Sequence, residues 1–142
     1  MLTVYLDDEF SFPPSARGKH FDDVYLIFDR NAAPYAIAMA DDGVMVMAGL
    51  WAKWKDPKSG SEVLSCTILT CTPNDVMAKL HDRMPVILAE SDWPKWLGEE
   101  AATDDELPEL LAPCPDDALK VWPVGKAVGN VKNTGRQLAM PV

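Results

Sequence analysis

An imidazole and a guanidinium stand two residues apart at His81 and Arg83, with Asp82 between them. A histidine can move a proton near neutral pH, and an arginine can hold a phosphate through two parallel hydrogen bonds. The pair stands where a predicted helix passes into the apolar residues 85–88, and such a junction can present both side chains outward. From these residues alone, a surface histidine beside a structural arginine is the simpler interpretation, and proton transfer next to a phosphate is the alternative.

Aromatic side chains offer a second kind of chemistry, because tryptophan rings can stack on unpaired bases. Most of the five tryptophans fall within apolar periodic segments, which predicts core packing. Trp54 is the exception, since it stands between Lys53 and Lys55, and it is the tryptophan for which we expect DNA contact. The five are Trp51, Trp54, Trp93, Trp96 and Trp122.

The thiols do not form a recognisable metal motif. Cys66, Cys71 and Cys114 make an odd count without a C-x-x-C pair, which favours free thiols in a reducing compartment. A zinc site that adds His81 to these three can be drawn, but the five-residue separation of the first two is irregular and the other ligands lie far along the chain. We therefore expect no metal.

Composition and charge bound the possible functions. The 142 residues are enough for about one domain, and 48% hydrophobic with 25% charged residues is typical of globular proteins. A net charge of −9 argues against nucleic-acid binding over the whole protein surface, so any nucleic-acid site must be local. No apolar run is long enough for a membrane helix, and residues 1–8 do not resemble a signal peptide, so a cytoplasmic location is expected.

The elements that must position these residues can be predicted from periodicity and turn signals. Apolar runs at 35–40 and 44–51 flank Asp41-Asp42-Gly43, which predicts a β-hairpin, and the run at 63–70 could pair with it. Gly98 can close a helix that opens near Ser91. Further strands are expected at 24–28, 85–88 and 119–124, and short helices at 73–81, 91–98 and 107–111. The fold class is therefore α+β, with a mixed, mainly antiparallel sheet or partial barrel and short helices.

Several motifs resemble, in order and spacing, those of the SOS response-associated peptidase (SRAP) family. The late motif from His81 to Leu88 is the most recognisable. The resemblance covers residues 34–142 and includes Pro-Tyr-Ala-Ile at 34–37, Ala-Gly-Leu-Trp-x-x-Trp at 48–54, Thr-Ile-x-Thr at 67–70, Trp-x-x-Trp-Leu at 93–97, Pro-Val at 123–124 and Val-Gly-Asn-x-x-Asn at 128–133.

This resemblance implies a DNA-damage function. Such domains trap abasic sites in single-stranded DNA as a covalent adduct, and can remove their own initiator methionine, without a metal or an organic cofactor. The α-amine and thiol of an N-terminal cysteine condense with the sugar aldehyde to give a thiazolidine. By the same resemblance, His81 would transfer protons, Arg83 would contact phosphate, and Thr70 would line the site. The implied partner is single-stranded DNA that carries abasic sites.

Three family features are absent from the 142 residues. Leu2 stands where the family has its cysteine, no Asn-Ala-Arg occurs, and Tyr25 is followed by Leu26 rather than by Glu-Trp. Internal cysteines have no α-amine beside them, so we expect no thiazolidine. We therefore interpret residues 1–33 as a divergent segment and residues 34–142 as the C-terminal part of a SRAP-like domain. A truncated reading frame is the hypothesis that explains both the missing motifs and the divergent segment.

Two other interpretations stay open at this level. The chain could be a non-catalytic remnant or a single-stranded DNA-binding module, or its likeness to the family could be accidental and the fold an ordinary α+β domain. If a companion half of the domain is missing, the strands should have open edges and exposed apolar faces, which residues 1–33 would cover only in part.

Overall fold

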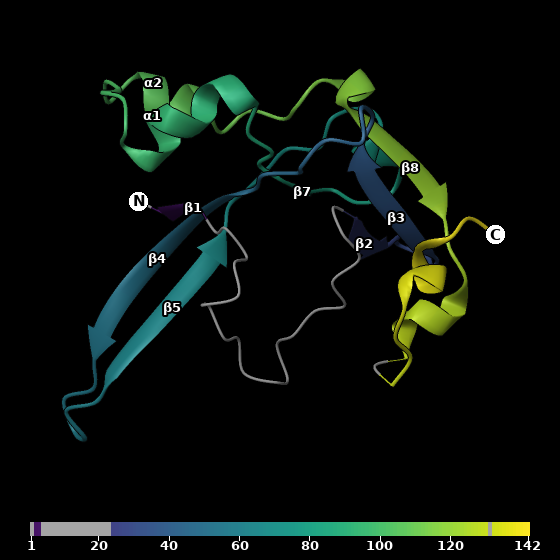
Figure 1. Ribbon diagram of the computed structural model, residues 1–142, viewed down its shortest axis with the longest axis horizontal. Helices are drawn as coiled ribbons and strands as arrows, with labels where there is room; N and C mark the ends of the chain where they lie inside the picture. The colour runs from purple at the N-terminus through teal and green to yellow at the C-terminus, as the bar shows by residue number, and fades with distance from the viewer. Residues whose placement is uncertain (1, 4–23, 131) are drawn as a thin grey trace. The chain divides into compact units, whose positions relative to one another are not determined.

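The computed structural model describes residues 2–3, 24–130 and 132–142 of the chain (Figure 1). These residues form two compact units. The first contains β1 with residues 46–72 and 83–114. The second contains residues 24–45, 73–82 and 115–142. Most of the predicted divergent segment 1–33 lies outside the described residues.

The first unit is built on an antiparallel sheet with the strand order β1-β4-β5. It comprises β1 (Leu2–Thr3), β4 (Ala48–Lys55) and β5 (Glu62–Ile68). A turn joins β4 to β5, in which the backbone N–H of Asp56 donates to the carbonyl of Ser61 at 2.9 Å. The predicted pairing of the strand near 63–70 with the strand that ends at Trp51 is confirmed.

Short elements complete the first unit. β6 (Thr70–Cys71) pairs with β7 (Met84–Pro85), and Met47 forms an isolated bridge with Ile87. A 3-10 turn, η2 (Glu90–Asp92), leads into the helix α1 (Trp93–Leu97), and α2 (Glu106–Glu109) follows. The buried side chains of this unit include Val46, Ala48, Met84, Val86, Leu88 and Trp96.

Helix α1 ends where the sequence predicts. Gly98 adopts the left-handed conformation with φ of 77°, and its N–H caps the carbonyls of Lys95 and Pro94. Glycine has no Cβ to hinder this conformation, which explains why a helix closes here. We expect Gly98→Ala to lower the free energy of unfolding by about 1 kcal/mol. Urea denaturation measures this change, and an unchanged midpoint would contradict the role of Gly98 as a cap.

Helix α2 begins with a reciprocal capping box. The Thr103 hydroxyl accepts from the N–H of Glu106 at 3.3 Å, and the Glu106 carboxylate accepts from the N–H of Thr103 at 2.9 Å. Lys95 also donates to this carboxylate, at 2.9 Å. These bonds, with the Thr103 N–H contributing most, lower the pKa of Glu106 from 4.5 to about 2.

The lowered pKa makes stability depend on pH. A carboxylate whose pKa is lower in the folded state contributes fully above its unfolded pKa, and this contribution is lost as the pH falls through the folded value. We therefore expect Glu106 to support folding above about pH 4.5 and to lose that effect progressively toward pH 2. Thermal melts of wild type and Glu106→Gln should differ at pH 6 and converge at pH 2. A constant difference would contradict this linkage.

The second unit is built on an antiparallel sheet with the strand order β2-β3-β8. β3 (Pro34–Met39) lies between β2 (Tyr25–Phe28) and β8 (Leu119–Pro123), so Ile37 is paired with Tyr25 on one side and Val121 on the other. The 3-10 turns of this unit are η1 (Met77–Lys79), η3 (Asp116–Ala118), η4 (Lys126–Gly129) and η5 (Arg136–Ala139). Part of its core is a cluster of Ala36, Val124, Val128 and Leu138, which packs against Val24, Leu26, Trp122 and Ala139.

The predicted β-hairpin between residues 35–40 and 44–51 is wrong. The turn exists, since the N–H of Gly43 donates to the Asp41 carboxylate at 2.8 Å, but β3 and β4 belong to different sheets. β3 pairs with β8, which follows about 80 residues later. Three consecutive buried residues, 36–38, mark a central strand, and local turn chemistry does not identify the distant partner of such a strand.

The helix predicted at 73–81 is also shorter than expected. Only η1 forms, and ahead of it the carboxamide oxygen of Asn74 accepts from the N–H of Met77 at 2.9 Å. The strand predicted at 44–51 lies at 48–55, and the strand predicted at 85–88 is reduced to β7 with an isolated bridge at Ile87. The other predicted elements are present with small shifts of their ends. The α+β class, with mainly antiparallel strands and short helices, is confirmed.

Candidate functional site

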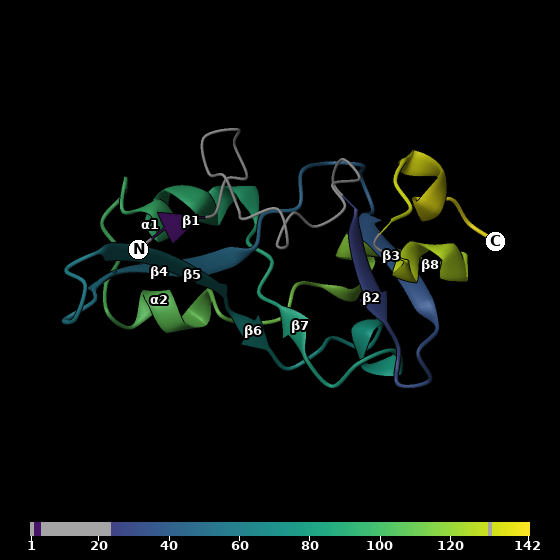
Figure 2. The same cartoon turned by 90° about the horizontal axis from the view of Figure 1, so that it is seen from below.

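Two of the predicted site residues come together on a short two-stranded sheet in the first unit. Thr70 begins β6, and Arg83 immediately precedes β7. The register pairs Thr70 with Pro85 and Cys71 with Met84, which brings the chain back beside Thr70 after thirteen residues. Figure 2 shows β6 and β7 side by side.

Arg83 is held against Thr70 by three hydrogen bonds. One terminal nitrogen of its guanidinium donates to the Thr70 carbonyl at 2.6 Å and to the Thr70 hydroxyl at 2.8 Å, and Nε donates to the same hydroxyl at 3.2 Å. Both residues are solvent exposed. A positively charged, planar group is thus fixed on the surface, and a fixed guanidinium loses less entropy when it binds an anion.

Cys71 lies next to this pair but is buried. Burial raises the pKa of its thiol above the ordinary value, although the positive charge of Arg83 partly opposes the shift. Because the thiolate is the nucleophilic form, a thiol with a raised pKa is poorly reactive near neutral pH. Cys71 is therefore a packing residue rather than a replacement nucleophile.

His81 belongs to the second unit, whereas Arg83 belongs to the first. The His81 side chain is 45% exposed, and its Nδ1 lies 3.0 Å from Oδ1 of Asp82. Its backbone N–H donates to the carbonyl of Met77 at 2.9 Å, which attaches it to the end of η1. A carboxylate beside Nδ1 orients the ring, as a proton-transferring histidine requires. The arginine and the threonine are the residues that the structure brings together.

Trp54 lies on β4 and is 55% exposed. Side chains alternate between the two faces of a strand, so Trp54 points away from the face that carries Lys53 and Lys55. Lys53 itself forms an ion pair with Glu62 at 2.7 Å. The two lysines that made Trp54 a DNA candidate in the sequence are therefore on the opposite side of the hairpin. Of the tryptophans expected in the core, Trp96 is buried and Trp93 and Trp122 are half-buried. The prediction is wrong for Trp51, which is 44% exposed on β4.

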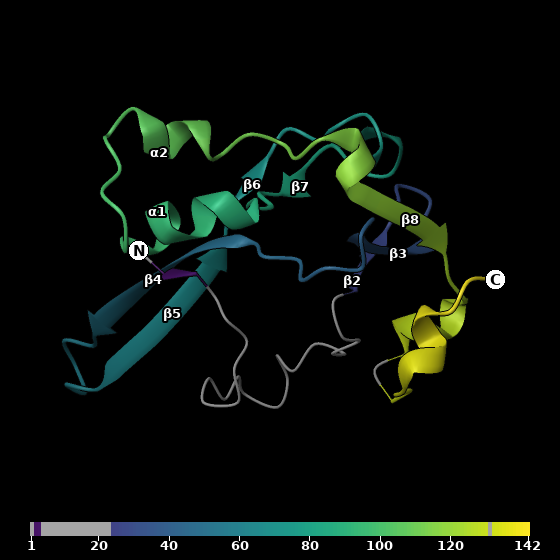
Figure 3. The same ribbon diagram turned by 45° about the horizontal axis from the view of Figure 1, so that its top comes forward.

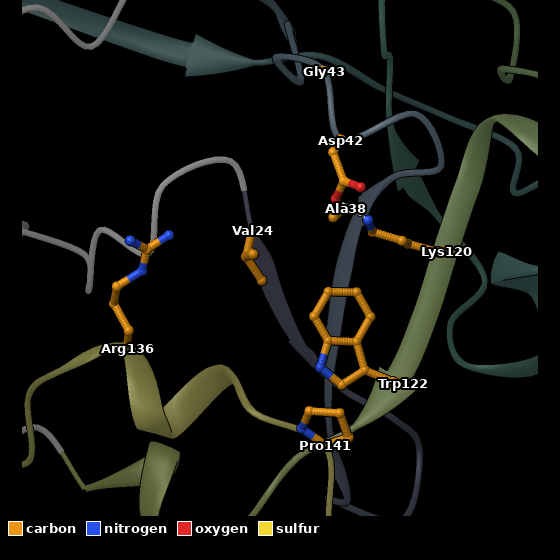
Figure 4. Close-up of a pocket in the computed structure, with 8 residues that line it drawn as sticks. All are labelled: Val24, Ala38, Asp42, Gly43, Lys120, Trp122, Arg136 and Pro141. Carbon is orange, nitrogen blue, oxygen red and sulfur yellow. Dashed lines mark hydrogen bonds and ion pairs between the residues drawn. The ribbon is translucent and has the colours of Figure 1, made fainter.

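A pocket in the second unit was not predicted from the sequence (Figure 4). It has a volume of about 530 Å³. Lys120 forms an ion pair with Asp42 at its wall, and the indole N–H of Trp122 donates to the carbonyl of Ala139 at 2.7 Å. The sequence could have indicated this wall of the pocket, because Lys120 and Trp122 are two residues apart on one strand and therefore share a face. The lining residues are Val24, Ala38, Asp42, Gly43, Lys120, Trp122, Arg136 and Pro141.

Among the described residues, no group of three or more His, Cys, Asp or Glu side chains could hold a metal ion. Cys66, Cys71 and Cys114 are free cysteines. Within the described ranges, the structure has no helix with the length and hydrophobicity needed to cross a membrane.

The chain is similar to a family of known proteins. The model of the family described as SOS response associated peptidase (SRAP) matches residues 28–131. The abasic site processing protein YoqW of Bacillus phage SPbeta is 35% identical over 105 residues, which are 74% of this chain and 46% of that protein. The abasic site processing protein YedK of Escherichia coli is 29% identical over 110 residues, or 77% of this chain and 49% of YedK. The chain thus spans about half the length of these relatives.

Solved structures show the same fold. A protein from Bacteroides thetaiotaomicron superposes with a TM-score of 0.75 over 84% of this chain and 54% of its own, at 23% identity. A protein from Bordetella bronchiseptica superposes with a TM-score of 0.63 over 72% of this chain and 52% of its own, at 27% identity. The matched part of each is again about half of the whole.

Proposed function

The chain belongs to the SOS response associated peptidase (SRAP) family, and we propose that it acts in the response to DNA damage by binding single-stranded DNA at abasic sites. Its relatives YoqW and YedK are named abasic site processing proteins. The 142 residues contain the His-x-Arg motif but neither Asn-Ala-Arg nor Gly-Phe-Tyr-Glu-Trp. We therefore propose binding without covalent adduct formation by these residues alone.

The observation that carries this proposal is the exposed Arg83 guanidinium fixed on Thr70. In a chain with a net charge of −9, phosphate binding requires a local cation at a defined place. The three bonds to Thr70 fix the orientation of Arg83, so that the guanidinium can meet a phosphate in one geometry. Thr70 is the positioning residue, and Arg83 makes the contact.

We propose a different role for His81. Its imidazole, oriented by Asp82, is suited to proton transfer during the covalent chemistry that the family resemblance implies. Because the 142 residues are not expected to form the adduct, His81→Gln should leave their DNA affinity unchanged. A cytoplasmic location, where the thiols stay reduced, is part of the same proposal.

The test is to measure binding of a single-stranded oligonucleotide that carries one unreactive abasic analogue, at several salt concentrations. Loss of one phosphate contact should lower the slope of log affinity against log salt by about 0.7 in Arg83→Ala. Arg83→Lys keeps the charge but loses the bonds that orient the guanidinium on Thr70, so its slope should stay closer to wild type than that of Arg83→Ala. Fluorescence anisotropy measures both.

A matched control is Arg30→Ala, which removes an exposed arginine in the second unit. It should change the net charge by the same amount as Arg83→Ala without the same loss of affinity. Equal affinities and equal slopes for wild type and Arg83→Ala would exclude the proposed phosphate contact. Equal losses in both variants would indicate a nonspecific effect of net charge.

A further inference from the structure

The sheet of the second unit has a hollow on one face. Ala38 of β3 is paired with Lys120 of β8, and directly opposed residues of an antiparallel pair share a face. Ala36 is paired with Trp122, two residues away on each strand, so it lies on this face too; Figure 3 shows β8 beside β3. The central strand therefore carries small side chains between the larger ones of its neighbours. The pocket of about 530 Å³ lies over this face, because Ala38, Lys120 and Trp122 line it.

The lining of this pocket carries a net positive charge. It includes two cations, Lys120 and Arg136, and one acid, Asp42. Figure 4 shows the two cations on opposite sides of the pocket, with Lys120 turned toward Asp42. The ammonium group of a lysine has three donors, so its ion pair with Asp42 leaves donors that a ligand can use. The lining is therefore suited to a ligand with a negatively charged group.

The charge of the surrounding sequence has the same sign. Residues 120–142 contain no aspartate or glutamate, although the whole chain has a net charge of −9. A local excess of cations raises the concentration of anions near a site. The cations of this stretch are Lys120, Lys126, Lys132 and Arg136.

The indole of Trp122 forms a fixed wall of the pocket. Its N–H donates to the carbonyl of Ala139 at 2.7 Å, and Val124 forms an isolated bridge with Pro141. These contacts attach the residues after η5 to β8, so this wall is already ordered before a ligand binds. Trp122 is half-buried, and an accessible indole offers a planar ring a surface for stacking.

We propose that this pocket binds an aromatic anion of the size of a mononucleotide, with its ring against Trp122 and its anionic group at Lys120. The volume lies within the range of small-molecule sites, which is about 300–1,000 Å³. A free nucleotide and a nucleotide within a single strand share this chemistry. The inference does not depend on DNA binding by Arg83, which belongs to the first unit.

Titration calorimetry of the 142-residue chain with deoxyadenosine monophosphate tests the proposal. Deoxyadenosine alone and inorganic phosphate alone should each bind at least about tenfold more weakly, because each keeps one of the two contacts. Lys120→Gln should weaken binding of the mononucleotide by about tenfold, since a charged hydrogen bond is lost. Asp42→Asn should strengthen binding by about two- to fivefold, because it removes a negative charge beside the bound anion.

Opposite effects of the two partners of one ion pair distinguish ligand binding from a structural role. Asp42 is 83% exposed and has φ of 61°, a conformation that asparagine also adopts, so Asp42→Asn should fold normally. Lys126→Gln is the matched control, because Lys126 is exposed and is not among the lining residues. It should leave the affinity unchanged, as should Arg83→Ala. Circular dichroism of each variant checks the fold.

Three results would overturn the proposal. The first is no binding of the mononucleotide by the wild-type chain, and the second is weaker binding in both Lys120→Gln and Asp42→Asn. The third is an equal loss in Lys120→Gln and Lys126→Gln, which would indicate an effect of net charge alone. Competition with an oligonucleotide that has no abasic site then distinguishes the two sources. Displacement of the mononucleotide from Arg83→Ala supports a nucleotide within a strand, and unchanged mononucleotide binding supports a free nucleotide.

Discussion

Trp96→Ala should lower the free energy of unfolding of the first unit by about 3–5 kcal/mol. Trp96 lies on α1 and is 3% exposed, so its indole fills volume that alanine would leave empty. A loss of this size is expected when a large cavity is left in a small core, because the neighbouring backbone cannot collapse fully into the space. Urea denaturation followed by circular dichroism measures this change.

Trp96→Phe separates packing from hydrogen bonding at the same position. Nε1 of Trp96 is buried without a hydrogen-bond partner among the described residues. An unsatisfied buried donor costs about 1–3 kcal/mol, so its removal should offset much of the smaller cavity that phenylalanine leaves. We expect a net change of about 1 kcal/mol or less. A loss as large as that of Trp96→Ala would show that the indole N–H is bonded after all.

Ile37→Ala should lower the free energy of unfolding of the second unit by about 2–5 kcal/mol. Ile37 is 1% exposed on the central strand β3, with Tyr25 and Val121 as its neighbours across the sheet. Its side chain is therefore packed where relaxation is difficult.

The matched control is Val44→Ala, in the same unit, where the side chain is 61% exposed. This change should stay within about 0.5 kcal/mol of wild type. Comparison of the two urea midpoints measures the contribution of burial. Equal losses in the two variants would contradict the placement of β3 at the centre of its sheet.

Local sequence signals predicted the positions of helices and strands better than the pairing between strands. Gly98 closes α1 as expected, and the strand at 119–124 is present, because cap chemistry and β-branched runs act over a few residues. The hairpin across Gly43 was wrong because a turn signal does not tell whether the flanking strands pair with each other. The partner of β3 is β8, and such a distant contact leaves no short-range mark on the sequence.

In the candidate site, too, single residues were predictable from the sequence, whereas their contacts across strands were not. The sequence identified Thr70 and Arg83 separately, but not that the guanidinium would rest on the Thr70 carbonyl and hydroxyl, which depends on the β6–β7 pairing. For Trp54, neighbouring lysines in the sequence suggested a shared surface. The alternation of side chains along β4 places them on opposite faces, and this could have been predicted once the segment was assigned as a strand.

The most direct measurement incubates the purified chain with a single-stranded oligonucleotide that carries one reactive abasic site, and then compares native with denaturing gels. We predict a complex on the native gel that is weakened by Arg83→Ala, and no adduct that survives denaturation. A denaturation-resistant adduct, located by mass spectrometry, would contradict binding without covalent chemistry. No complex on either gel would contradict the proposed role of Arg83 in holding DNA.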